Sequence, residues 1–364
     1  MHSGTAAGTP PCSGLPAEYR AAVEAHLAAF LDAKERSGTA GGPVPEDVPA
    51  LLREFIGAGG KRIRPLLCIA GWQAGGGTGL PGEVVGTAAA LEMFHAFALI
   101  HDDIMDGSVT RRGRTTVHQM LADRLGAALD PDQAEQLGVS AAILVGDLAL
   151  TWSDELLYTD LTPHRLAAVL PLVMAMRAET VHGQYLDITS ARRPSTDASL
   201  ALRIARYKTA AYTVERPLHI GAALAGAQPE LLAGLSAYAL PAGEAFQLAD
   251  DLLGVFGDPQ TTGKPNLDDL RGGKHTVLVA LAREHATPEQ RDTLDALLGR
   301  PGLGPQDATR LRRILVATGA RAEVEHLITE RRNRALTALN ALALPTPLAD
   351  ALSRLTLGSA AHPA

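Results

Sequence analysis

The chain has 364 residues, of which 46% are hydrophobic and only 20% are charged, a composition typical of a globular protein with a large core. Its net charge of −7 argues against nucleic acid or a polyanionic surface as the main partner. Two cysteines, Cys12 and Cys68, give no disulfide framework, and the sequence has neither a leader-like N-terminus nor a run of 18 apolar residues. We therefore expect a cytoplasmic protein without stable membrane insertion.

The chain favours helices almost throughout, because Ala and Leu dominate and strand-like alternation is scarce. Residues 1–16 are rich in Gly, Pro, Ser and Thr, and we expect them to form a disordered tail. We predict helices after the Gly cluster at 57–60, in a long segment that ends at residues 102–106, and over 17–33, 46–56, 132–157, 163–188, 197–225, 229–255, 274–284, 288–298, 306–318, 321–341 and 346–356. No linker divides the chain, so the sequence predicts one all-α domain over 17–359.

The end of the long apolar helix carries the first candidate site. Asp102, Asp103 and Asp106 fall within five residues there, and Asp102 and Asp106 lie about 40° apart on one helix face. Two stacked carboxylates repel each other unless a cation joins them. Ligands that are all oxygen predict Mg²⁺ or Mn²⁺ rather than Zn²⁺. The alternative is a solvated acidic turn or a helix cap.

Basic residues gather near this acidic stretch. Arg111 and Arg112 suit the phosphates that Mg²⁺ commonly shares with its protein ligands. Lys61, Arg62 and Arg64 follow a Gly-rich turn and predict an anion cradle at a helix start, although solvated cations are the plainer alternative. His95 lies seven residues before Asp102, hence within about 20° on the same face, and is a candidate phosphate contact or a satisfied core histidine.

A second acidic stretch, Asp250 and Asp251, lies near the end of another predicted helix, one turn after Gln247. Two helices that each end in an aspartate pair can face each other across a cavity and share metal ions. A polar segment follows it and carries Lys264, Asp268, Asp269, Arg271 and Lys274. Lys208 and Thr209 interrupt an apolar helix, where an inward-facing Lys needs an anionic partner. Gln184 and Asp187 add polar groups to a further helix.

Together these motifs resemble the trans-isoprenyl diphosphate synthases, the polyprenyl synthetase family. The resemblance covers the chain from about Ala17 to Ser359 and rests on GGKRIRP at 59–65, HDDIMD at 101–106, RRG at 111–113, GQYLD at 183–187, KT at 208–209, FQLADD at 246–251 and GKPNLDDLRGGKHT at 263–276. It implies an all-helical bundle around a deep central cavity, with the two acidic motifs facing each other at its mouth. It also implies a homodimer.

The resemblance assigns roles to these residues. The implied ligands of three Mg²⁺ ions, for which Mn²⁺ could substitute, are Asp102, Asp106 and Asp250, with Asp103 and Asp251 completing the two pairs. Arg111, Lys208 and Lys264 would complete the grip on an allylic diphosphate, with Lys274 nearby. The isopentenyl diphosphate contacts would be Lys61, Arg64, His95 and Arg112. Thr209, Gln247 and the Lys208 carbonyl would face the allylic cation.

The implied reaction is a 1'-4 condensation of isopentenyl diphosphate with an allylic diphosphate by ionisation, condensation and elimination, with no covalent enzyme intermediate. A terpene cyclase is the rival enzyme class, and a non-catalytic partner subunit is the non-enzymatic alternative. The sequence departs from the family at Gly254, where many relatives carry a third aspartate, and at Pro241, which we expect to kink its helix.

Product length depends on side chains below Asp102. Ala98 leaves the first turn open, whereas Phe97 and Phe94 are bulky. Helix geometry favours Phe94 as the stop, because Phe97 lies about 140° from Asp102. The family pattern of one aromatic followed by a small residue resembles the C20 synthases and implicates Phe97. We follow the family pattern and expect geranylgeranyl diphosphate, with a farnesyl or a C25 or longer product as the alternative.

Overall fold

The computed structural model describes residues 15–40, 42, 44–191, 193–257 and 267–358. Residues 1–14, most of the predicted tail, and Lys264 lie outside the described residues. The helices are α1 (Ala17–Thr39), α2 (Val48–Gly57), α3 (Ile63–Ala74), α4 (Gly82–Met105), α5 (Val117–Leu125), α6 (Pro131–Thr159), α7 (Pro163–Ser190), α8 (Ala198–Ala205), the π-helix η1 (Arg206–Glu215), α9 (Arg216–Leu224), α10 (Pro229–Phe256), α12 (Asp268–Gly272), α13 (Val277–His285), α14 (Pro288–Leu297), α15 (Pro305–Ala317), α16 (Ala320–Ala341) and α17 (Thr346–Gly358).

The prediction of an all-α fold is confirmed, because the described strands are only β1 (Thr110–Arg111) and β2 (Arg114–Thr115). These two strands pair antiparallel in a hairpin directly after α4. The helices α5 and α12 were not predicted. The first helix also continues to Thr39 rather than ending near residue 33, because Arg53 of α2 pairs with Glu35 at 3.0 Å and ties the extra turns to the rest of the fold.

The predicted helix over 197–225 is divided by a π-helical segment, η1, between α8 and α9. Residues 206–215 contain the predicted site residues Lys208 and Thr209. A π-helical turn widens the helix and commonly marks a functional site. The segment packs closely on α7, where a Cβ at Gly183 would lie 2.6 Å from the Lys208 backbone nitrogen. Gly183 therefore permits this approach.

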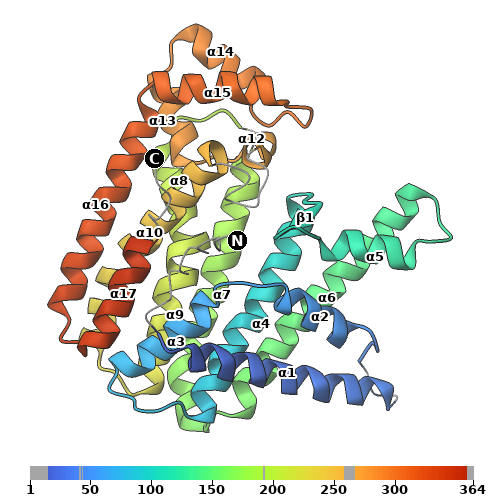
Figure 1. Ribbon diagram of the computed structural model, residues 1–364, viewed down its shortest axis with the longest axis vertical. Coiled ribbons are helices and arrows are strands. Elements are labelled where there is room, and N and C mark those ends of the chain that lie inside the picture. Colours follow the sequence, from blue (N-terminus) through green and yellow to red (C-terminus); the bar gives the residue numbers. More distant parts are fainter. Residues whose placement is uncertain (1–14, 41, 43, 192, 258–266, 359–364) are drawn as a thin grey trace, which may run out of the picture.

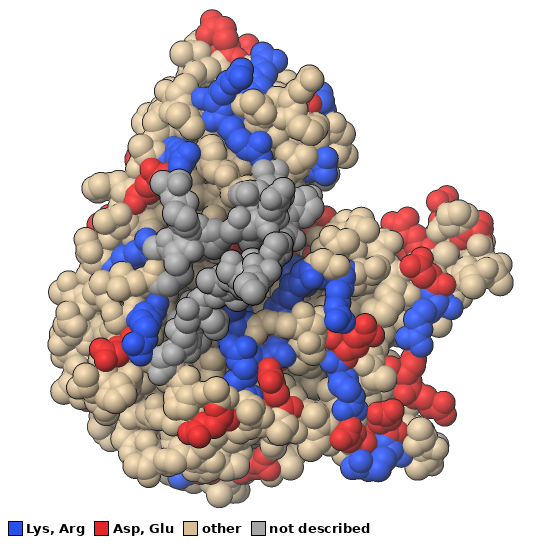
Figure 2. All heavy atoms as spheres, viewed as in Figure 1, with Lys and Arg blue, Asp and Glu red and all other residues tan. Residues whose placement is uncertain are grey.

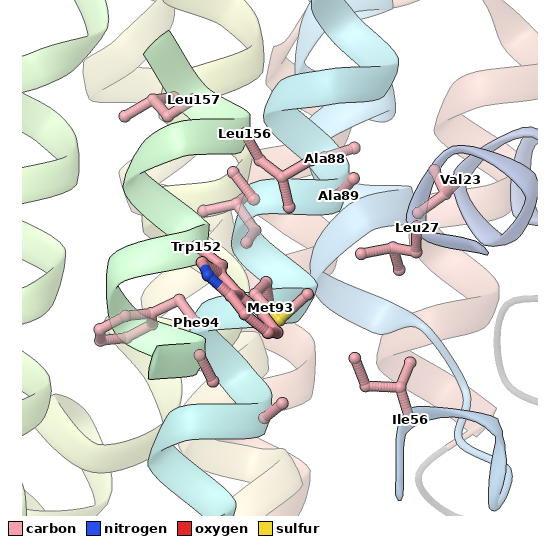
Figure 3. Close-up of a cluster of buried hydrophobic side chains, with 14 of the residues drawn as sticks. Val23, Leu27, Ile56, Ala88, Ala89, Met93, Phe94, Trp152, Leu156 and Leu157 are labelled. Carbon is pink, nitrogen blue, oxygen red and sulfur yellow. The ribbon is translucent and has the colours of Figure 1, made fainter. Parts of the chain in front are cut away.

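Helix α4 lies in the middle of the bundle and packs chiefly against α6 (Figure 1). Figure 3 shows Met93 and Trp152 in contact with this core, with Val23 and Leu27 of α1 on one side and the ring of Phe94 pointing to the other. A helix that is apolar on all faces belongs in a core. Because α4 is buried along most of its length, its last turn presents the aspartates at a fixed place.

The remaining helices frame α4. Helices α7 and α10 pack against η1, and α10 also packs against α16. Helix α16 runs along the side of the molecule opposite to α5 (Figure 1). Pro241 lies inside α10, which continues unbroken from Pro229 to Phe256. The ends of α4 and α10 that carry the two acidic stretches point toward the same end of the bundle, beneath α12–α15 (Figure 1).

Within the described part of the chain, α4 and α6 are long and apolar enough to cross a membrane. A buried core helix can have the same length and composition. The apolar stretch of α4 is 72% buried, as expected for a core helix, but that of α6 is only 28% buried. Helix α6 therefore exposes an apolar surface that its own fold leaves uncovered.

Candidate active site

The first acidic stretch closes α4 and is held by an arginine from the following hairpin. Arg111 Nε donates to both carboxylate oxygens of Asp103 at 2.8 Å, and its Nη2 lies 3.1 Å from Asp102 Oδ2. The hairpin can fold back onto α4 because Gly107 and Gly113 adopt φ values of 62° and 74°. The side chain of Asp103 is only 1% exposed, so Asp103 positions Arg111, whereas Asp102 remains accessible.

One side chain of α7, Gln184, and one of η1, Lys208, contact the Asp102 carboxylate. Lys208 Nζ lies 3.1 Å from Asp102 Oδ1 and 2.6 Å from Asp187 Oδ2. Gln184 Nε2 donates to Asp102 Oδ1 at 3.1 Å. The sequence predicted that an inward-facing Lys208 needs an anionic partner, and the structure provides two, Asp102 and Asp187. The sequence singled out Gln184 and Asp187 only as polar groups on a helix, and their role in holding this centre became visible only with the packing of α7 on α4.

Lys274 connects the first acidic stretch with Asp269 of α12. Its Nζ lies 3.1 Å from Asp269 Oδ1 and 3.8 Å from Asp106 Oδ2. A side chain at Gly254 would overlap the Asp269 carboxylate. Where many relatives carry a third aspartate in the second motif, this chain has Gly254, and the Asp269 carboxylate of α12 occupies the space beside that glycine. Sequence reasoning did not assign this role to Asp269, because its pairing depends on how α12 folds back on α10.

Two hydrogen bonds of Gln247 connect Asp251 of the second acidic stretch with Thr209 of η1. Thr209 Oγ1 donates to Gln247 Oε1 at 2.5 Å, and Gln247 Nε2 donates to Asp251 Oδ1 at 2.7 Å. Asp250 is exposed at the end of α10. The structure therefore brings the predicted residues Thr209 and Gln247 together and orients the Gln247 amide through partners on both sides.

The carboxyl pKa values follow from burial and from the nearby charges. Burial alone would raise the pKa of Asp102, but the Lys208 ammonium lowers it below its usual value. Burial and the neighbouring Asp102 charge raise the pKa of Asp106. Burial also raises the pKa of Asp103 to about 6 and that of Asp251 to about 8. The site therefore retains protons near neutral pH that a bound cation would displace.

A second group of basic residues, in addition to Arg111, Lys208 and Lys274, includes Arg64 and His95. We call it the second basic region. Arg64 stacks over the Tyr212 ring at 4.1 Å and donates to Thr213 Oγ1 at 2.7 Å. His95 Nδ1 lies 3.1 Å from the Tyr212 hydroxyl. Burial, then Arg64 and Arg112, hold the pKa of His95 well below its usual value, so this imidazole is neutral. The sequence did not single out Tyr212, which connects Arg64 with His95.

The remaining basic residues of this region differ in accessibility. Lys61 and Arg112 are exposed, and Arg112 Nη1 donates to the Gly59 carbonyl. Arg62, by contrast, is buried and lies 2.8 Å from Glu92 Oε1 and 3.1 Å from Glu24 Oε1. Its inclusion in the predicted anion cradle was wrong, because its charge is paired with the buried Glu92 and with Glu24 of α1. Lys and Arg side chains gather near the centre of the face drawn in Figure 2.

An apolar cavity lies deeper in the bundle between α4, α6 and α7. Its lining residues are Ala90, Leu91, Phe94, Ser153, Leu157, Val173, Met176 and Arg177. Phe94 is 2% exposed and reaches this cavity, whereas Phe97 is half-buried and packs its ring against Phe94 at 5.3 Å and His101 at 4.7 Å. Ala98 is also half-buried and lies beside the same cluster. Because Phe94 lines the cavity and Phe97 does not, Phe94 is better placed than Phe97 to limit the length of a chain that enters it.

The donor groups fit a cation that is shared with a substrate. Among the residues that the structure describes, no three or more His, Cys, Asp or Glu side chains form a metal-binding group. Carboxylates without sulfur or imidazole donors suit Mg²⁺, which binds one or two carboxylates and takes its other ligands from water and substrate phosphates. Asp102 and Asp106, already close to Lys208 and Lys274, are placed for this kind of shared coordination.

Comparison with known proteins agrees with this geometry. Residues 45–315 match the model of the polyprenyl synthetase family. The chain is 34% identical over 286 residues to geranylgeranyl diphosphate synthase of Mycobacterium tuberculosis, covering 78% of this chain and 75% of that protein. It is 34% identical over 276 residues to geranylfarnesyl diphosphate synthase of Aeropyrum pernix, covering 76% and 81%. A crystal structure of geranylgeranyl pyrophosphate synthase from Corynebacterium glutamicum, complexed with isoprenyl diphosphate and magnesium, superposes with a TM-score of 0.89 at 40% identity, covering 94% and 98%.

Proposed function

We propose that this chain, which belongs to the polyprenyl synthetase family and is a trans-prenyltransferase, condenses isopentenyl diphosphate with an allylic diphosphate to give mainly geranylgeranyl diphosphate. The observation that carries the proposal is the pairing of Lys208 with Asp102 and of Lys274 with Asp106 at the end of α4, two turns beyond Phe94, which lines an apolar cavity. The charged end of α4 would bind the diphosphate of the substrate, and the apolar lining would contact its prenyl tail.

At the allylic end, Asp102, Asp106 and Asp250 would hold Mg²⁺, which neutralises diphosphate charge when it is bound. Arg111 and Lys208 flank the same position and stabilise the negative charge that develops on the leaving group. They need no large movement, because both already face Asp102. Lys264 belongs to the same proposal but lies outside the described residues.

At the acceptor end, Lys61, Arg64 and Arg112 bind the diphosphate of isopentenyl diphosphate without a metal. A neutral His95 donates a hydrogen bond to a phosphate oxygen while Tyr212 fixes its ring. A site with four such groups has no purpose in a terpene cyclase, which takes only one diphosphate substrate. The second basic region therefore favours the synthase over the cyclase.

Between these ends, the allylic cation needs electron-rich neighbours that do not react with it. The hydroxyl of Thr209, the amide of Gln247 and the carbonyl of Lys208 supply oxygen dipoles of this kind, and the Thr209–Gln247 hydrogen bond fixes two of them. The isopentenyl double bond attacks the cation, a carbon–carbon bond forms, and the departed diphosphate accepts the proton that is lost.

The proposal also includes a homodimer in the cytoplasm. Exposed apolar residues recur every three or four positions along α7, namely Met174, Ala178, Val181, Tyr185 and Ile188. Helix α6 exposes Leu137, Ile143, Leu144 and Tyr158. An uncovered apolar surface of this extent supports a protein interface, and a second copy of the chain offers a matching one. We call this surface the α6–α7 face.

The test is incubation of the pure protein with isopentenyl diphosphate, farnesyl diphosphate and Mg²⁺, followed by product analysis. An elongated prenyl diphosphate supports the synthase. A hydrocarbon or alcohol would identify a cyclase, and the absence of turnover would identify a non-catalytic subunit.

A further inference from the structure

A charged side chain is part of the lining of the apolar cavity. Arg177 of α7 lines it together with Phe94, and its guanidinium lies 5.4 Å from the centre of the Phe94 ring. Arg177 also donates to Ser153 Oγ at 2.9 Å and pairs with Asp154 Oδ1 at 2.7 Å. A cation in an apolar cavity is costly to desolvate, so its partners on α6 hold it in place.

The position of this arginine follows from the pairing of α7 with α4. Gln184 bonds to Asp102 at the site, so these two residues lie at the same level. Arg177 is seven residues before Gln184, about 10 Å along α7, and Phe94 is eight residues before Asp102, about 12 Å along α4. The two helices therefore bring Arg177 and Phe94 to one layer, in agreement with their stacking.

This layer has more than one barrier to a prenyl tail. The Phe94 ring is the lining group of α4 nearest to Asp102, where it stands in the way of a tail, and its packing against the guanidinium restricts its movement. If the ring moved aside, an apolar tail would meet the Arg177 side chain, whose buried Nε has no hydrogen-bond partner. Further extension would require the tail to displace Arg177 from Ser153 and Asp154.

We propose that Arg177 is a specificity-determining residue that, with Ser153 and Asp154, forms a polar floor beneath Phe94 and limits the length of the product. The proposal rests on the proposed prenyltransferase function. It concerns differences in length between variants, so it does not depend on the wild-type product being C20.

The experiment compares the wild type, Phe94→Ala, Arg177→Met and the double variant with farnesyl diphosphate and excess isopentenyl diphosphate. We expect Phe94→Ala to add at most one isoprene unit, because Arg177 remains. The double variant should extend further and raise the ratio of longer to shorter products about tenfold over Phe94→Ala. A double variant with the same product distribution as Phe94→Ala would overturn the proposal.

Two controls separate specificity from general loosening of the fold. Arg165, on the same helix, stacks over Trp72 at 5.5 Å and pairs with Glu83, away from the cavity. Arg165→Met should leave product length unchanged, and an equal lengthening there would overturn the proposal. Arg177→Lys should keep the wild-type length because it retains the charge. If the double variant does not fold, the milder Phe94→Leu is compared with Phe94→Leu/Arg177→Met, and equal product lengths in these two folded variants would overturn the proposal.

Discussion

Asp102 is the residue on which the site converges. Three separate elements send a donor to it, namely Arg111 from β1, Lys208 from η1 and Gln184 from α7. Cations held this close to a carboxylate are already placed to contact a diphosphate that binds there through a metal. The arrangement thus prepares the charge stabilisation before the substrate arrives, which avoids reorganisation during the reaction.

At the same scale, Arg64 tests the assignment of the second diphosphate site. Arg64→Ala should raise the KM for isopentenyl diphosphate about 10- to 100-fold, because it removes charge-assisted hydrogen bonds, and should change the KM for the allylic substrate much less. Steady-state kinetics with each substrate varied in turn measure both values. Arg114→Ala is the matched control, since Arg114 is 57% exposed and pairs only loosely with Glu54 at 3.4 Å. Equal effects on both substrates would show that the two sites are misassigned.

The raised carboxyl pKa values predict that Mg²⁺ binding releases protons. Asp251, with a pKa of about 8, is protonated at pH 7 without a cation, and the pKa of Asp106 is also raised. A bound cation favours the ionised form, so metal affinity should increase as the pH rises from about 6 to about 8. Calorimetric titration in two buffers of different ionisation enthalpy counts the protons released. Asp251→Asn should release fewer protons, and an unchanged count in this variant would contradict the assignment.

At the scale of elements, the position of α4 decides how the tail cavity is bounded. The helix places Asp102 at its end, Ala98 one turn lower and Phe94 one further turn down, where the lining of the cavity begins. The adjacent π-helix η1 brings Lys208 beside Asp102, and Gly183 of α7 permits the close approach of η1 to α7. Head-group chemistry and tail length are thus controlled by different parts of the same helices.

Substitutions along α4 should change product length in opposite directions. Ala98→Phe fills the turn directly below Asp102 and should shorten the product toward C15. The family pattern predicts that Phe97→Ala lengthens the product beyond C20, whereas the cavity lining predicts that Phe94→Ala has the larger effect. Chain-length analysis of the three variants decides between these expectations. A longer product from Ala98→Phe would contradict both.

Particular residues show what the sequence could and could not predict about these elements. The spacing of Asp102 and Asp106 and the apolar run before them predicted both the helix and its acidic end. The burial of Arg62 against Glu92 and the pairing of Asp269 with Lys274 could not be predicted, because they depend on helices that meet only after folding. The π-helical form of residues 206–215 was missed for the same reason, since its close contact with α7 overrides the local pattern.

At the scale of the whole molecule, the α6–α7 face predicts the oligomeric state. A charge introduced into this face, as in Val181→Glu, should weaken the dimer by about 100-fold or more, because the charge would have to be desolvated in an apolar interface. Sedimentation velocity over a range of concentrations measures the effect. Val316→Glu on α15 is the matched control, since Val316 is 53% exposed and Val181 is 59% exposed. A wild-type protein that stays monomeric at high concentration would contradict the proposed homodimer.

The most direct test of the central claim is the length of the product that the wild-type protein makes from farnesyl diphosphate, isopentenyl diphosphate and Mg²⁺. The bulky Phe94 two turns before Asp102, with the small Ala98 between them, predicts geranylgeranyl diphosphate as the main product, separated by chain length after removal of the diphosphate. No activity should remain when the metal is chelated. A wild-type product of C30 or longer, or no condensation of farnesyl diphosphate beyond C15, would contradict the account.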